Sequence, residues 1–314
     1  MSMKPNSSLI TIDNNIEKIV QFIKDMIIEP RKKAHYWSKI TNQTPNLKIG
    51  YPAQHLASLI CGMKGTATGT RGDDIIDGTE VKGCSKIDQV DKCKDCGENV
   101  LRTDTKCPYC GSSNIKRLND SKWLIGIRSE DELRMLLEET PRFIFIVTDY
   151  PNFEEEDFDT MRIRSFEVWV KSDRCKNFRT LMENYYTYIF KEHKKKDPNK
   201  NPAPKNLFPD NFPFYMCNPI KTFECIIKNG LSDNPQIDIT KYVEPDADRK
   251  DLQSEDMPSS LLNKDEAEVL SKYGIDINVV PYISEKHRKN LCLRDTDKCI
   301  KVIGTKKHKK STKI

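Results

Sequence analysis

The first part of the chain carries apolar residues at helical spacing. Between residues 12 and 40, isoleucine, valine and phenylalanine recur every three or four positions, and Asp13 or Asn14 precedes them as a candidate cap. The segment PAQHLASLICGMKG (52–65) has proline in its first turn and glycine at its end, which predicts a short buried helix. The following GTATGTRG (65–72) is predicted to be a flexible loop.

The middle of the chain alternates strand-like and helix-like segments. IID (75–77) and TEVKG (79–83) are predicted to be two short strands separated by a bend at Asp77-Gly78. Further strands are predicted from β-branched and aromatic content, and one helix begins with a capping-box pattern. These strands are 121–127, 142–150 and 161–171, and the helices are 129–140 and 174–193. The alternation predicts an α/β fold.

Polar and proline-rich segments divide the rest of the chain. Residues 197–214 are predicted to lack regular structure and to form a long loop or a connection between lobes. Residues 215–230 are strand-like, and 239–260 are predicted to be another polar connection. The pattern then predicts a helix, a turn at Gly274 and a second helix from Ser284. This pair is either a DNA-reading helix-turn-helix or an ordinary helix pair.

The composition is that of a polar protein. The 314 residues are 37% hydrophobic with a mean hydropathy of −0.67, and this length suits one large domain or two ordinary ones. No apolar run approaches the roughly 18 residues that a membrane span requires. The N-terminal MSMKPNSSLITIDNN lacks the layout of a signal peptide, so we expect a cytoplasmic location and no membrane partner.

The charge is unevenly distributed, although its net value is only +5. Residues 153–159 are acidic, residues 191–200 are basic, and the last fifteen residues contain six lysines and no acid. Such asymmetry suits a polyanionic partner, and a solvated lysine tail is the alternative.

Four of the eleven cysteines have the spacing of a zinc ribbon. The run CKDCGENVLRTDTKCPYCG has the pattern C-x2-C-x10-C-x2-C, formed by Cys93, Cys96, Cys107 and Cys110. Two residues between cysteines let one tight turn direct both sulfurs at a single ion. Four thiolates leave no open coordination position, so we expect a structural Zn²⁺, with unrelated cysteines or a redox pair as the alternatives.

The other seven cysteines show no pairing pattern. Disulfides are not expected in a cytosolic chain, and we interpret these residues as core or incidental positions. They are Cys61, Cys84, Cys175, Cys217, Cys225, Cys292 and Cys299.

A second cluster lies in GDDIIDGTEVK (72–82), where four acids and one lysine surround three aliphatic residues. Residues two apart in a strand share a face, so Glu80 and Lys82 are predicted to point the same way while Val81 enters the core. Two carboxylates and a main-chain carbonyl form an oxygen-rich site for a hard ion such as Mg²⁺. A lysine beside them can orient a water or neutralise charge on a phosphate. A surface hairpin is the alternative.

The order of these segments resembles the PD-(D/E)xK nuclease superfamily. A short helix, a loop of small residues, an aspartate and Gly-x-Glu-x-Lys follow one another, as in MutH-type endonucleases. From DGTEVKG through the cysteine ribbon to SKWLIG the chain is further similar to the MamI family of type II restriction endonucleases, within residues 50–130. The resemblance implies a mixed central sheet flanked by helices, an inserted zinc ribbon and a smaller, mostly helical C-terminal region.

The resemblance also implies roles for the acidic cluster. Asp74 and Glu80 would hold Mg²⁺ together with the main-chain carbonyl of Val81, and Lys82 would assist the attacking water. Asp73 is the alternate first acid, because its spacing to Glu80 matches MutH-type enzymes.

Neighbouring residues depart from the family patterns. Gln54, His55 and Ser58 stand on the upstream helix where MutH-type enzymes carry a glutamate, and no proline precedes the acids. Asp77, at the bend, is predicted to be a turn residue.

The implied activity is Mg²⁺-dependent hydrolysis of phosphodiester bonds in double-stranded DNA by a homodimer that reads a palindromic target. Cations around 191–205 and 306–313 are expected to contact phosphates, and 171–180, 201–211 and 288–296 are candidate base readers. The ribbon is expected to contact DNA or to staple an insertion. A monomeric repair or nicking nuclease and a non-catalytic zinc-ribbon DNA-binding protein are the other classes.

The expected organisation follows from the same boundaries. Residues 1–195 form the nuclease core, with the ribbon inserted at 88–118. Residues 196–250 complete the core or form a DNA-contacting lobe, and 251–314 form a helical region with a basic tail.

Overall fold

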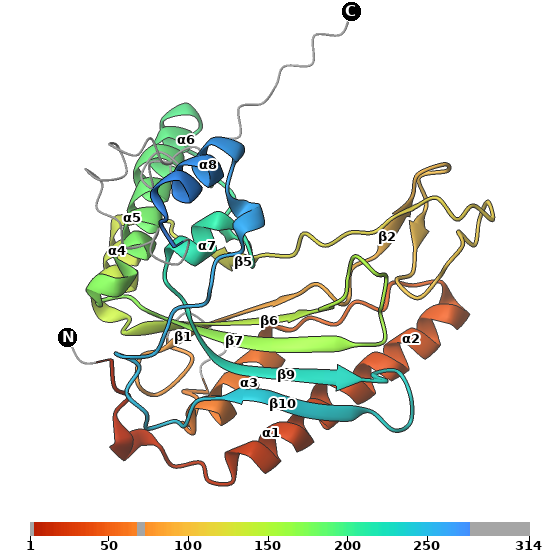
Figure 1. Cartoon of the computed structure of the whole chain (residues 1–314), viewed down its shortest axis with the longest axis horizontal. Helices are drawn as coiled ribbons and strands as arrows, with labels where there is room; N and C mark the ends of the chain where they lie inside the picture. Colours follow the sequence, from red (N-terminus) through yellow and green to blue (C-terminus); the bar gives the residue numbers. More distant parts are fainter. Residues whose placement is uncertain (1–2, 68–72, 277–314) are drawn as a thin grey trace, which may run out of the picture.

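A mixed five-stranded sheet forms the centre of the protein (Figure 1). The computed structural model describes residues 3–67 and 73–276. The strand order is β1-β6-β7-β9-β10, with β1 parallel to β6 and the other pairs antiparallel. The bounds are β1 Glu80–Ser85, β6 Arg142–Asp149, β7 Met161–Trp169, β9 Ile220–Lys228 and β10 Gln236–Tyr242. The predicted α/β class with a mixed central sheet is confirmed.

Two smaller sheets accompany the central one. A three-stranded sheet, ordered β3-β2-β4, consists of β2 Asp91–Cys93, β3 Asn99–Val100 and β4 Ile115–Lys116. It lies beyond one end of the central sheet, at the right of Figure 1. The second small sheet pairs β5 Trp123–Ile125 with β8 Lys205–Leu207 in antiparallel orientation.

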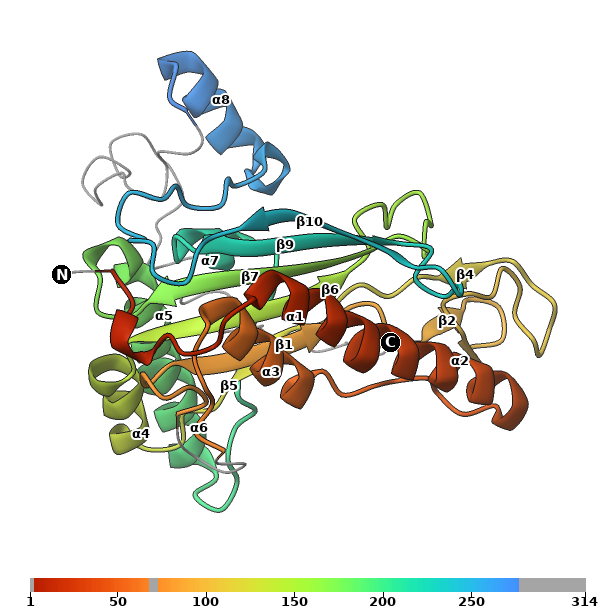
Figure 2. The same ribbon diagram turned by 90° about the horizontal axis from the view of Figure 1, so that it is seen from below.

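Helices cover both faces of the central sheet, as Figure 2 shows. They are α1 Asn15–Ile23, α2 Glu29–Thr41, α3 Gly50–Cys61, α4 Glu130–Arg134, α5 Lys176–Tyr185, α6 Lys191–Lys196, α7 Phe212–Met216 and α8 Lys264–Tyr273. π-helical turns at Lys24–Ile28, Met135–Glu139 and Tyr186–Phe190 join or extend them, and short 3₁₀ turns lie at Ser7–Leu9, Asp173–Cys175 and Ser259–Leu261. Among the described residues, no helix has the length and apolar character needed to cross a membrane.

Strand β6 separates the two hydrophobic layers. Ile144 and Ile146 pack in the layer that contains α1 and α3, whereas Phe143, Phe145 and Val147 pack in the layer that contains α5 and α7. Every residue of β6 is buried, because both faces of the strand are covered.

Three of the predicted boundaries are wrong. Residues 75–77 form a turn with an isolated bridge from Ile75 to Gly65, and the strand begins only at Glu80. The proline-rich segment 197–214 is not devoid of regular structure, since β8 pairs with β5 and α7 begins at Phe212. The segment 239–260 begins inside β10. Only β8 owes its structure to pairing with a strand far away in the sequence, since residues 75–77 turn back toward Gly65 and β10 pairs with the preceding strand β9.

The predicted C-terminal helix pair is described only in its first half. Helix α8 starts with a capping box between Asn263 and Glu266 and ends at Gly274, whose φ of +60° suits glycine. The second helix, predicted from Ser284, lies outside the described residues.

The contact of α3 with β1 predicts the effect of one substitution. A Cβ on Gly83 would lie 2.7 Å from the Ala53 Cβ and 3.3 Å from the Ile49 carbonyl oxygen. We therefore expect Gly83→Ala to lower the free energy of unfolding by about 1–3 kcal/mol. Gly50→Ala is the control, since no atom of the described residues lies within 4 Å of a Cβ there. Equal denaturant midpoints for the two variants would contradict this close packing.

Candidate active site and cysteine cluster

A hydrogen-bonded turn joins the first acids to β1. The Asp74 and Ile75 amides both donate to the Thr79 carbonyl oxygen, at 3.0 and 3.2 Å. The Gly78 amide donates to the Ile75 carbonyl oxygen at 2.9 Å, and Gly78 adopts a φ of +88° that favours glycine. This closed turn fixes the backbone of Asp74 relative to Glu80.

The turn and β1 border a cavity of about 530 Å³. Further lining comes from the end of β5, from α4 and from the π-helical turn after it. The lining residues are Gln54, Asp73, Asp74, Glu80, Val81, Lys82, Ile125, Gly126, Arg128, Glu132, Met135, Leu136, Thr140 and Phe143. All of the sequence-predicted residues of the acidic site therefore meet in one cavity.

The Asp74 carboxylate is hydrogen-bonded to the edge of β1 that faces away from β6. Its Oδ2 accepts a hydrogen bond of 2.7 Å from the Val81 amide, and its Oδ1 accepts one of 2.6 Å from Gln54 Nε2 on α3. In a strand the N–H and C=O of one residue point to the same side, so the Val81 carbonyl also faces away from β6. The Val81 side chain is buried, as predicted.

Glu80 and Lys82 lie on the same side of β1 and form an ion pair. Both side chains are about one-quarter exposed, at 26% and 25%. Burial raises the pKa of the Glu80 carboxyl, and Lys82 opposes that shift. Burial also raises the pKa of Asp74, against the Val81 hydrogen bond. Two desolvated carboxylates thus share a cavity with one lysine.

The neighbouring acids differ from these two. Asp73 lines the same cavity, but its side chain is exposed. Asp77 accepts the Thr79 amide at 3.1 Å, which is the turn role predicted for it. Its second oxygen also forms a 3.0 Å ion pair with the buried Arg142. The interpretation of Asp77 as a turn residue alone is therefore incomplete, since the ion partner is 65 residues away.

The structure brings the four ribbon cysteines together. The Sγ atoms of Cys93, Cys96, Cys107 and Cys110 lie within 4.8 Å of one another. The two halves are alike, because the Gly97 amide donates to the Cys93 carbonyl at 3.0 Å and the Gly111 amide to the Cys107 carbonyl at 2.9 Å. Both glycines have positive φ. This geometry fits a tetrahedral metal ion with four sulfur ligands.

Buried ion pairs lie inside the ribbon, and contacts of its arginines attach it to the core. Asp91 is fully buried and pairs with Arg102 at 3.2 Å and Arg117 at 2.9 Å. The Arg102 guanidinium also lies 5.2 Å from the Phe153 ring and 5.0 Å from the Phe158 ring. The ribbon is therefore held against the segment between β6 and β7.

Several cations predicted to contact DNA have partners inside the fold. Arg174 donates to Ser254 Oγ at 2.8 Å, and Lys205 in β8 is 5% exposed. Lys191, Lys195 and Lys196 of the basic cluster are exposed. The candidate segments 288–296 and 306–313 lie outside the described residues, as do Cys292 and Cys299, whereas Cys61, Cys84, Cys175, Cys217 and Cys225 are buried, as predicted.

Comparison with known proteins identifies the family. The MamI restriction endonuclease family matches residues 36–260, which is most of the chain. The protein belongs to the MamI restriction endonuclease family. The type II restriction enzyme MamI of Microbacterium ammoniaphilum is 32% identical over 80 residues, which span 24% of this chain and 26% of that enzyme. No solved structure matches the chain.

Two cavity residues of this MamI family member escaped the sequence interpretation. Arg128 and Glu132 line the same cavity as Glu80. Glu132 Oε2 accepts the Arg128 amide at 2.7 Å, and the Glu132 amide donates to Ser129 Oγ at 3.0 Å. The pattern differs from a capping box in one contact, because the Glu132 carboxylate accepts the amide of Arg128 rather than that of the cap residue Ser129. Nothing local in the sequence indicates that this helix start lines the cavity of Glu80.

The raised pKa of Glu80 predicts a gain in stability when its charge is removed. An acid with a raised pKa in the folded state weakens folding once pH rises through that pKa. We expect Glu80→Gln to unfold at a higher temperature than the wild type at pH 7 without metal, and the difference to shrink as pH falls toward the ordinary glutamate range.

Glu224→Gln is the matched control with the opposite sign. Burial alone would raise the pKa of Glu224, but hydrogen bonds from Lys221 and Thr240 outweigh it and lower the pKa. This variant should unfold at a lower temperature than the wild type at pH 7. A destabilised Glu80→Gln protein would show that the Glu80 carboxylate is favourably paired.

Proposed function

We propose that this protein is a type II site-specific endonuclease that hydrolyses phosphodiester bonds in double-stranded DNA with Mg²⁺. The observation that supports it most is the shared cavity of Asp74, Glu80 and Lys82 at the open edge of β1. Membership of the MamI family and the relative named as a type II restriction enzyme point the same way.

The oxygen atoms at this edge suit a hard divalent cation. The Asp74 and Glu80 carboxylates and the Val81 carbonyl would hold Mg²⁺, with Gln54 orienting Asp74 through its hydrogen bond. Burial raises the pKa of both carboxyl groups, and a bound cation would favour their charged forms. When bound, Mg²⁺ would act as a Lewis acid on the scissile phosphate.

Side chains of the protein would position the attacking water and the DNA strand. Lys82 would release Glu80 to the cation and then orient the attacking water or neutralise developing charge on the phosphate. Arg128, which is exposed and lines the same cavity, would contact a neighbouring phosphate and align the DNA strand. Asp74 is preferred to Asp73 as the first acid, because it is the one hydrogen-bonded to both Gln54 and Val81.

Cutting both strands calls for two active sites, so we propose a homodimer on a palindromic target. A monomeric nicking or repair nuclease would carry the same cavity, and plasmid products distinguish the two. Discrete linear fragments support the restriction enzyme, whereas open circles alone support the nicking enzyme.

The first functional prediction concerns the acids. Asp74→Asn, Glu80→Gln and Lys82→Ala should each lower the rate of Mg²⁺-dependent plasmid cleavage at least about a hundredfold, because each removes charge from the reacting centre. DNA binding in Ca²⁺, measured by gel shift, should persist. Asp73→Asn is the matched control and should retain cleavage. An inactive Asp73→Asn beside an active Asp74→Asn would move the site by one residue.

The second functional prediction concerns the cysteine cluster, which we propose holds one structural Zn²⁺ per chain. Cys96→Ser should lose the zinc and cooperative unfolding of the ribbon, because metal binding and folding are coupled. Cys217→Ser, at a buried cysteine outside the cluster, should keep the zinc. Metal analysis of protein purified without chelators checks both, and zinc-free wild-type protein would refute the proposal.

A further inference from the structure

A network of charges, buried except for the partly exposed Asp77, lies directly behind the candidate active site. Arg142, the first residue of β6, is 0% exposed, and Glu167 of β7 and Arg249 are equally buried. Arg142 pairs with Glu167 at 3.1 Å and with Asp77 at 3.0 Å. Glu167 pairs in turn with Arg249 at 3.3 Å. Two positive and two negative groups thus alternate within the core.

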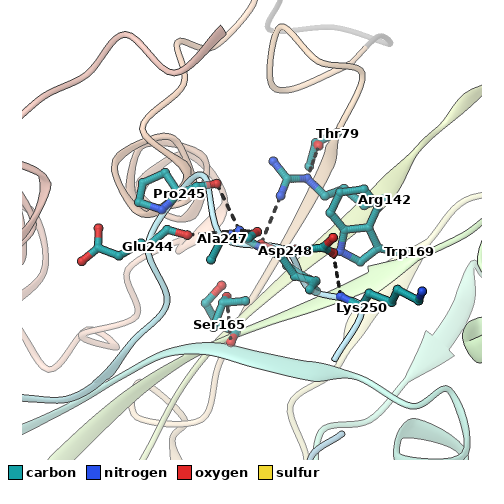
Figure 3. Close-up of polar contacts among 12 residues, drawn as sticks. Thr79, Arg142, Ser165, Trp169, Glu244, Pro245, Ala247, Asp248 and Lys250 are labelled. Carbon is teal, nitrogen blue, oxygen red and sulfur yellow. Dashed lines mark hydrogen bonds and ion pairs between the residues drawn. The ribbon is translucent and has the colours of Figure 1, made fainter. Parts of the chain in front are cut away.

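Arg142 reaches the turn that carries the acids. Its Nε donates to Thr79 Oγ1 at 2.8 Å, and Figure 3 shows the guanidinium directed at Thr79 beside the Trp169 indole. Thr79 supplies the carbonyl oxygen that accepts both the Asp74 and Ile75 amides. The Arg142 side chain therefore fixes Thr79, the residue immediately before Glu80. Thr79 in turn accepts the hydrogen bond of the Asp74 amide.

The far end of the network is anchored as firmly. Arg249 donates to the carbonyl oxygens of Glu244 and Pro245, at 3.1 Å each, and to that of Ala247. Trp169 Nε1 donates to Glu167 Oε2 at 2.8 Å. Figure 3 shows the Glu244–Lys250 segment passing beside Arg142 and Trp169. Arg142 accordingly has little freedom to move away from the turn.

Such a network is a poor way to gain stability. Desolvating four charged groups offsets most of their attraction, and apolar side chains of similar volume often stabilise a core as well. The network instead fixes the orientation of the groups that it joins, because a guanidinium presents its hydrogen-bond donors in a rigid, planar arrangement. Here the guanidinium joins Thr79 and Asp77 on one side and Glu167 on the other.

We propose that Arg142 is a positioning residue, which sets the separation of the Asp74 and Glu80 carboxylates for a divalent cation by holding the 74–79 turn through Thr79 and Asp77. This inference rests on the proposed function, since it concerns the cation of the same site. Arg142 would thus contribute to metal affinity although it neither lines the cavity nor supplies a ligand atom.

Mn²⁺ binding, followed by calorimetry on the full chain, tests the proposal. Arg142→Lys keeps the charge but loses the planar guanidinium, and Thr79→Val keeps the shape but removes the acceptor. Each should weaken Mn²⁺ binding about tenfold, as loss of an outer-shell partner typically does. The Mg²⁺ concentration for half-maximal plasmid cleavage should rise by the same factor, with KM for DNA unchanged.

Arg164→Lys is the matched control. Arg164 is also buried and also bridges two acids, Asp149 and Asp210, but it lies in β7 away from the turn. It should lose stability without losing Mn²⁺ affinity, which separates positioning from general destabilisation. If Arg142→Lys does not fold, Thr79→Val carries the test alone.

The outcomes separate the two proposals. Wild-type affinity in Arg142→Lys and Thr79→Val would overturn the positioning role, as would equal weakening in Arg164→Lys. Wild-type protein that binds Mn²⁺ through Asp74 and Glu80 but cleaves no plasmid would overturn the proposed function and leave the positioning role standing. Wild-type protein that binds no Mn²⁺ would overturn the positioning role.

Discussion

The parallel pairing of β1 with β6 is the constraint on which the candidate site depends. It places Glu80 opposite Phe143 and therefore Thr79 next to Arg142, at the start of both strands. Within residues 3–67 and 73–276, β1 is an edge strand, so no described strand uses its outer N–H and C=O groups. Asp74 accepts one of these N–H groups, from Val81. One carboxylate thus covers the sheet edge and lines the cavity.

The site combines low local stability with firm support. Glu80 and Asp74 are held partly desolvated, which raises the pKa of each. Protein sites that bind or react commonly sacrifice stability in this way. Behind them the turn is closed by its own amides and tied to Arg142 in the core. The turn fixes the backbone of Asp74, and contacts with Gln54, Val81 and Lys82 hold the two carboxylates.

The cysteine ribbon is an insertion with its own small core and a rigid attachment. Cys93, Val100 and Cys107 pack together, Asp91 pairs with two arginines inside the ribbon, and Arg102 contacts the rings of Phe153 and Phe158 outside it. It follows the C-terminal end of β1, whereas Glu80 lies at the N-terminal end. The strand therefore separates the ribbon from the acids, so a surface that used both would have to span the length of β1.

Local pattern alone determined much of this protein. The helical spacing of residues 12–40, the apolar run of β6 and the paired cysteines each depend on neighbours within a few residues, and their structures agree with the predictions. Period two likewise put Glu80 and Lys82 on one side of β1. Only tertiary structure decided that Gln54 and Val81 hold Asp74, that Asp77 pairs with Arg142, and that β8 pairs with β5. The reason is physical: most of these contacts join residues 20 or more positions apart, and burial and pairing at such distances leave no periodic trace in the sequence.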